Sequence, residues 1–281
     1  MTPDTAHRDH AIPPRNIKFD LTEECPRDWY DDDPAISRFF DGMSIVFPEG
    51  ERFFIEAVRH YKDRIDDPRL LEQMRGFIAQ EAIHGREHEV YNELMQKNGL
   101  PQKKLDAQFM WLITRARKLL PWRNKLAGTC AAEHFTAMLA DSVLSDPTWN
   151  EKTHPVYRDL WNWHAVEETE HKAVAYDVYQ ATQTGLGGYL RRVIVYSLVI
   201  MVLNIRFAYH WAVLMRATGD LNLKAVGRLF WFIWGKPGLY RRQLGAALAY
   251  FKPSYHPWDH DNRAQVEAWK ELSEPGLMAA E

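Results

Sequence analysis

The sequence predicts an all-α protein, a bundle of four helices followed by additional C-terminal helices. From Pro48 onward, apolar residues recur at the helical period of 3.6 residues, and no long run alternates with the two-residue period of a strand. Four of the helical stretches also carry a carboxylate on the face that apolar residues would bury. Because a charged group enters a core only when something pairs it, this pattern predicts a shared polar centre inside the bundle.

The helices are placed by their start and stop signals. Proline suits the first turn of a helix because its missing N–H would be unbonded there, and glycine or proline suits the end. These signals predict bundle helices at 48–65, 68–98, 122–145 and 155–184, a short basic helix in FMWLITRARKLL between the second and third, and a short helix near 262–272. The glycines at 185, 187 and 188 are expected to end the fourth helix, and residues 17–47 are expected to be irregular or mixed.

Three parts are expected along the chain: a flexible N-terminal arm at 1–16, the bundle at 17–188, and aromatic-rich helices packed on the bundle or at a membrane surface at 189–281. The last part begins with a strongly apolar stretch, but Ser197, Asn204 and Arg206 interrupt it before it reaches the roughly 20 residues of a spanning helix. A buried helix packed on the bundle is the first expectation, an interfacial helix is the second, and a membrane-spanning helix is the third.

Composition restricts the function classes. The net charge is −3, which gives no electrostatic case for nucleic-acid binding. Two cysteines are too few for a disulfide scaffold or a cysteine-rich zinc or iron–sulfur site, and the polar N-terminus lacks the apolar core of a signal peptide. The expected location is cytoplasmic, with peripheral membrane association and a homodimer left open.

Helical geometry selects among the acidic residues of the first two helices. Glu51 shares its face with apolar residues, whereas Glu56 lies with arginines on a solvated face, so Glu51 is the candidate for the buried centre. On the second helix, Glu81, His84 and His88 form one stripe.

The third and fourth helices supply the remaining candidates. Glu133 lies on a face with small residues, which would leave room for a metal ion or a substrate. His164, Glu168 and His171 share one face of the fourth helix. Carboxylates together with imidazoles favour iron or manganese over magnesium.

Two motifs carry a family resemblance. The units EAIH at 81–84 and ETEH at 168–171 are each Glu-x-x-His. With one glutamate from each of two further helices, such units form the ligand set of ferritin-like di-iron and di-manganese bundles. His164, one turn before Glu168, extends the pattern, which then resembles that of the di-iron N-oxygenases that oxidise arylamines such as p-aminobenzoate.

A broader resemblance covers about residues 15–265. The blocks FPEGERFF, QEAIHGREH and WHAVEETEHKAVAYDVY are similar to a bacterial ferritin-like family described only as predicted metal-dependent hydrolases. The resemblances imply a ferritin-like four-helix bundle, and they imply as metal ligands Glu51, Glu81, His84, Glu133, His164, Glu168 and His171. His88 is not one of these ligands, and it is expected to contact a ligand histidine and orient its ring.

The expected activity is that of a non-haem di-iron oxidase or oxygenase that activates O₂ to oxidise a hydrophobic small molecule. The cofactor would be two iron ions, with manganese also compatible, and an external electron donor would be needed because the chain has no flavin or nucleotide motif. The C-terminal aromatic residues are expected to line an apolar entrance, to dock on a membrane or simply to pack in the core: Trp211, Phe230, Trp231, Phe232 and Trp234.

Hydrolysis is the alternative activity. A hydroxide bridging two divalent metal ions would be the nucleophile, and Glu87 or Glu167 would move protons. The stretch from His84 to His88 also fits H-x-x-E-H, a zinc-peptidase pattern in which Glu87 would act on water. That zinc pattern leaves Glu51 without a role.

Overall fold

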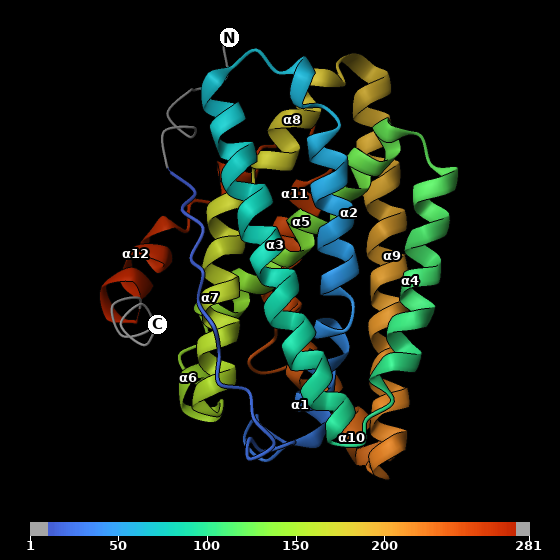
Figure 1. Cartoon of the computed structure of the whole chain (residues 1–281), viewed down its shortest axis with the longest axis vertical. Coiled ribbons are helices and arrows are strands. Elements are labelled where there is room, and N and C mark those ends of the chain that lie inside the picture. The colour runs from blue at the N-terminus through green and yellow to red at the C-terminus, as the bar shows by residue number, and fades with distance from the viewer. Residues whose placement is uncertain (1–10, 274–281) are drawn as a thin grey trace.

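The computed structural model describes residues 11–273, which form an all-α fold without a β-strand. Four helices form the bundle in Figure 1: α2 (Phe47–Arg59), α3 (Pro68–Lys97), α5 (Trp122–Leu144) and α7 (Pro155–His171). Helices α4 (Gln102–Leu119) and α9 (Gly185–Thr218) lie side by side along one edge (Figure 1). The predicted all-α class is confirmed.

The other elements are shorter. They are α1 (Pro34–Ser44), η2 (Lys62–Arg64), α6 (Trp149–Lys152), α8 (Val174–Thr182), α10 (Leu223–Trp234), η3 (Arg241–Gln243), α11 (Leu244–Ala249), η4 (Pro257–Asp259) and α12 (Arg263–Leu272). The predicted second and third bundle helices match α3 and α5 closely, and α12 is the helix expected near the C-terminus. The first predicted helix is shorter than expected, because α2 gives way to the single 3₁₀ turn of η2.

Two further details go beyond the sequence prediction. Residues 17–47, expected to be irregular or mixed, contain the helix α1. The side chain of Asp33 caps α1 by accepting hydrogen bonds from two backbone N–H groups, and Pro34 occupies its first turn. The predicted fourth helix is interrupted, since α7 ends at His171 and α8 begins at Val174.

The glycines after α8 begin a helix instead of ending one, which corrects the prediction. Gly185 has a φ of +71°, a left-handed conformation that residues with a Cβ disfavour. Gly188 lies against the backbone of Gln183, where an added Cβ would be 3.0 Å from the carbonyl carbon. These two positions let the chain reverse direction and enter α9.

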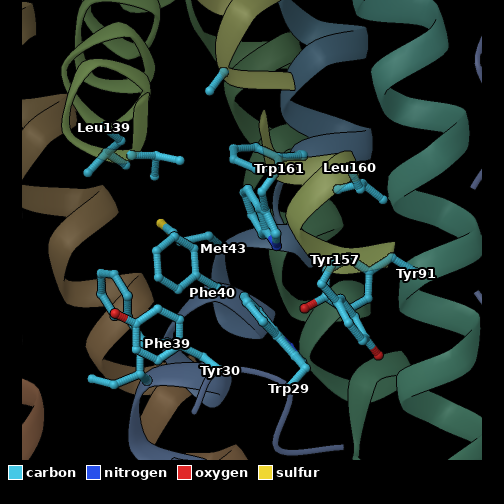
Figure 2. Close-up of a cluster of buried hydrophobic side chains, with 14 of the residues drawn as sticks. Trp29, Tyr30, Phe39, Phe40, Met43, Tyr91, Leu139, Tyr157, Leu160 and Trp161 are labelled. Carbon is cyan, nitrogen blue, oxygen red and sulfur yellow. The ribbon is translucent and has the colours of Figure 1, made fainter. Parts of the chain in front are cut away.

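A buried aromatic cluster fixes one end of the bundle (Figure 2). The rings of Trp29 and Tyr157 stack with centroids 4.8 Å apart, and the rings of Phe40 and Trp161 meet at 5.2 Å. Trp161 also lies 5.3 Å from the ring of His88. Because aromatic side chains bury large areas in few rotamers, this packing holds α1, α3 and α7 in place next to His88.

The described part of the N-terminal arm is packed on the bundle. Ile12 and Arg15 are both buried. Ile12 lies so close to Gly76 of α3 that a Cβ added to this glycine would be 2.8 Å from the Cβ of Ile12. The expectation of a flexible arm at 1–16 is therefore wrong for residues 11–16, and its first ten residues lie outside the described chain.

Helix α9 is exposed along most of its length, contrary to the first expectation of a buried helix. By length and composition it is the one helix within residues 11–273 that could cross a membrane, yet only 17% of its most apolar stretch is buried. Its inner face is tied to α1, because His210 donates to the carbonyl of Gly42 and Trp211 to that of Ala35, both at 2.9 Å.

Gly76→Ala is expected to destabilise the protein by on the order of 1 kcal/mol, because overpacking by about 1–3 kcal/mol outweighs the helical gain of alanine, about 1 kcal/mol. Urea unfolding measures this difference. Gly187→Ala in α9 is the control, since its Cβ would meet nothing within 4 Å. A Gly76→Ala protein as stable as the wild type would contradict the close packing of Ile12 on α3.

Candidate metal centre

The seven candidate ligands converge inside the bundle, and each is at most 3% exposed. They come from α2 (Glu51), α3 (Glu81 and His84), α5 (Glu133) and α7 (His164, Glu168 and His171). Two groups form: one of Glu51, His84 and His164, the other of Glu81, Glu168 and His171, each with its ligand-type atoms within 4.8 Å of one another. Glu133 adjoins the second group, because its Oε2 lies 3.4 Å from Nε2 of His171.

Glu168 lies between the two groups. Its Oε1 is 3.0 Å from Nε2 of His164 and 3.8 Å from Nδ1 of His84. Its Oε2 is 3.6 Å from Nε2 of His171. One carboxylate thus faces histidines of both groups, so Glu168 could offer one oxygen to each group.

Several buried atoms of this cluster make no hydrogen bond within the described chain. They are both carboxylate oxygens of Glu51, Glu81 and Glu133, together with Nδ1 of His84 and Nε2 of His171. The closest approach, 3.1 Å between Nε2 of His171 and Oε1 of Glu81, lacks the alignment of a hydrogen bond. Buried polar atoms are nearly always hydrogen-bonded. Since these atoms are also the types that bind transition metals, the residues fit a metal centre.

The pKa shifts of the four clustered carboxylates also fit a metal centre. Burial and repulsion between carboxylates raise the pKa of Glu51 and of Glu81 well above its ordinary value, and burial raises the pKa of Glu133 to about 7. Burial also acts on Glu168, but His171 and His164 outweigh it and hold the pKa of Glu168 well below its ordinary value. Clustered buried carboxylates ionise together only when positive charge accompanies them, and two divalent cations would balance all four.

Each imidazole of the cluster turns its other ring nitrogen toward an outer partner. The pairs are Nε2 of His84 with Oε2 of Glu167 at 3.0 Å, Nδ1 of His171 with Oε1 of Gln80 at 2.9 Å, and Nδ1 of His164 with Nε2 of His88 at 2.8 Å. Metal-binding histidines are usually oriented by such a partner. His88 is thus placed behind His164, and its own Nδ1 contacts Oγ of Ser44 at 2.9 Å.

Arg15 connects two of these outer partners. It donates to both oxygens of Glu170, at 2.7 and 2.8 Å, and to Glu167 at 3.1 Å. Gln80 donates to Glu170 at 3.0 Å. No sequence pattern singles out Arg15, Gln80 or Glu170 as part of the site. Arg15 stands in a proline-bearing segment without helical periodicity, so no sequence pattern related it to α7.

The two candidate proton carriers are placed differently. Glu167 contacts His84 and therefore adjoins the cluster. Glu87 instead pairs with Arg86 at 2.7 Å and accepts a hydrogen bond from the backbone of Phe19, so it is directed away from the seven side chains. The zinc-peptidase pattern also finds no support in this geometry, because both ring nitrogens of His88 already contact Ser44 and His164.

An apolar cavity of about 270 Å³ adjoins the cluster, with walls from α2, α4, α5 and α9. Apart from Asn124 and Thr136, its lining is apolar. Thr136 donates a hydrogen bond to Oε2 of Glu168 at 2.5 Å, and the lining glycine Gly50 immediately precedes Glu51. The cavity therefore reaches the candidate ligands from the side of α2 and α5.

The C-terminal aromatic residues do not line this cavity, which corrects one expectation. Its aromatic wall comes from Phe47, Phe53, Phe54, Phe109, Phe135 and Phe207. Trp211 and Phe232 are buried in the core, as the packing alternative held. Phe230, Trp231 and Trp234 are exposed.

The comparisons with known proteins gave one match. A family model described as "Predicted metal-dependent hydrolase" matches residues 13–261. Neither the curated proteins nor the solved structures gave a match to this chain.

Glu133→Gln is expected to lower the bound metal from about two divalent ions per chain to about one, because it removes one of the clustered carboxylates. Elemental analysis after dialysis measures the change. Glu56→Gln is the matched control, since the Glu56 carboxylate is 43% exposed and pairs with Arg117. Equal metal loss in both variants would contradict the proposed ligand role.

Gln80→Leu is expected to weaken metal affinity by about 10- to 100-fold, because it removes the hydrogen bond that orients His171. Competition with a chromophoric chelator reports the affinity. Gln96→Leu, on the same helix but bonded to the backbone of Lys103, should bind metal like the wild type. Unchanged affinity in Gln80→Leu would show that His171 is positioned without Gln80.

Proposed function

The chain belongs to the family of predicted metal-dependent hydrolases, and we propose that it is an enzyme whose seven buried ligands hold two metal ions next to an apolar substrate cavity. The proposed reaction is the O₂-dependent oxidation of a hydrophobic organic molecule, in a ferritin-like arrangement. Two irons are the proposed cofactor, with manganese compatible with the same ligands. When bound, the irons would supply the binding and reduction of O₂.

One observation carries the choice of oxidation. Glu51, His84 and His164 present one carboxylate and two imidazoles toward a common point. Two histidines and one carboxylate are the donor set typical of non-haem iron oxygenases. The second group, with two carboxylates and His171, adds the donors that a dinuclear carboxylate centre uses.

The residues of the chain would perform the remaining tasks. The apolar cavity would exclude water and hold a substrate by its hydrophobic surface. Thr136 borders the cavity and bonds to Glu168, so its hydroxyl would hold a proton at the boundary between substrate and ligands. Insertion of one oxygen atom of O₂ leaves the other as water, which requires two electrons and two protons. A separate electron donor would deliver these electrons.

Hydrolysis is the second candidate, favoured by the description of the family. Metal ions in the same ligands, zinc or manganese, would then supply an activated water. Glu167 is the carboxylate best placed to move a proton beside the centre, because burial raises its pKa to about 8 and it contacts His84 at 3.0 Å. The cavity offers few polar side chains to bind a hydrolysable group, which favours oxidation.

Anaerobic loading with ferrous ions followed by exposure to O₂ separates the two reactions. The wild type is expected to consume O₂ and to change its visible absorbance, and His164→Ala to lose most of both because it loses a ligand. His60→Ala, whose ring stacks on Trp122 outside the cluster, is the control. Absence of O₂ uptake, with cleavage of p-nitrophenyl hexanoate under nitrogen by the manganese or zinc form, would replace oxidation by hydrolysis.

A further inference from the structure

The outer face of α9 carries a continuous apolar stripe. Its members recur every three or four residues and are between 47% and 71% exposed: Leu186, Leu190, Ile194, Leu198, Met201 and Ile205. Single exposed apolar residues are ordinary on proteins, but a continuous exposed stripe marks an interaction surface. We refer to these six residues as the α9 stripe.

A groove of about 720 Å³ between α4 and α9 adjoins this stripe. Ile205 belongs to the stripe and lines the groove. Leu112 of α4 and Val202 of α9 line the groove and also the apolar cavity beside Thr136. The groove and the cavity therefore share two apolar side chains as a common wall, and Leu198 of the α9 stripe also lines the cavity.

The segments that form this face are unusually basic. Residues 185–218, which form α9, contain four arginines and no acidic residue, in a chain with a net charge of −3. Residues 102–125, which include α4, contain four lysines and three arginines against one acidic residue. Some of these cations are buried, but Arg115, Lys118 and Arg216 are exposed. An apolar surface bordered by cations is complementary to a bilayer that contains anionic lipids.

Arg115 and Trp111 form a cation–π pair at the edge of the groove. The guanidinium of Arg115 lies 4.2 Å from the centroid of the exposed Trp111 ring, and Trp111 lines the groove. Tryptophan and arginine both combine an apolar body with a polar end, so they are suited to the boundary between lipid and water.

The packing of α9 determines how it would meet a membrane. Its C-terminal half is bonded to α1 through His210 and Trp211. In its N-terminal half, the buried Arg192 donates to the carbonyls of Tyr250 and Lys252, at 2.7 and 2.9 Å. Because both halves are fixed to the protein, α9 can lie flat on a bilayer but cannot cross one.

We propose that the α9 stripe and the groove dock on an anionic lipid bilayer, and that a lipid-soluble substrate passes from the bilayer through the groove into the cavity. The docking rests on the apolar stripe and its bordering cations. The substrate route rests in addition on the proposed function of the cavity. A long apolar chain is the class of substrate that this route admits.

Vesicle sedimentation of the metal-loaded protein tests the docking. The wild type is expected to bind vesicles of phosphatidylcholine mixed with phosphatidylglycerol on the order of tenfold better than vesicles of phosphatidylcholine alone, and less well at high salt. Ile194→Glu combined with Met201→Glu should abolish most of this binding, whereas Leu272→Glu, on the exposed face of α12, should not. Wild-type protein that binds neither vesicle overturns the docking.

A second copy of the chain is the competing occupant, and size-exclusion chromatography without lipid identifies it. A wild-type dimer that the Ile194→Glu and Met201→Glu changes convert to a monomer would overturn the membrane assignment. A monomer in both cases supports it. Metal content and O₂ uptake of the double variant are expected to be unchanged, so a failure of docking is distinguished from a failure of the proposed function.

The substrate route has its own test. Parinaric acid placed in the anionic vesicles serves as the lipid-soluble probe, and energy transfer from tryptophan reports its uptake into the protein. Val202→Trp is expected to block the passage between the groove and the cavity, because its larger side chain would occupy the space beside the common wall. Uptake of the probe should fall on the order of tenfold, with vesicle binding retained. Exposed Met201→Trp is the control for the added tryptophan. Equal uptake by the wild type and Val202→Trp would overturn the route while leaving the docking intact.

Discussion

Four carboxylates share the interior of this bundle, and their mutual repulsion is the constraint on which the rest of the structure depends. Buried carboxylates at this density require compensating positive charge, because water cannot reach them. Glu168 obtains part of it from His171 and His164, and its pKa is lowered accordingly. The other three have raised pKa values, so they lack sufficient positive charge of their own. Bound metal ions would supply the positive charge that these three carboxylates lack.

The histidines are held in place by a second layer of polar contacts. Arg15 and Gln80 both bond to Glu170, and through Glu167 and Gln80 this layer reaches His84 and His171. The layer explains why the N-terminal segment is packed on α3 and α7. The guanidinium of Arg15 is a permanent cation that is separated from the ligand cluster by Glu167. It can therefore fix the geometry of the ligands without occupying a metal position.

Helix α9 has two roles that follow from its two faces. One face supplies apolar wall to the cavity and is tied to α1 through His210. The other is apolar and exposed, which a helix surrounded by water would ordinarily avoid. A bilayer as the partner of that face would connect the location of the protein with the access of its substrate, since Val202 and Leu112 lie on both the groove and the cavity.

Helical periodicity and local signals by themselves determined much of this protein. The all-α class, α3 and α5 followed from proline, glycine and the 3.6-residue repeat, and the same repeat distinguished the buried Glu51 from the partly exposed Glu56. Periodicity states which face of a helix is buried, but not what it is buried against. The contacts of Arg15, the direction of Glu87 and the exposure of α9 depend on segments distant in the sequence, so only the tertiary structure decided them.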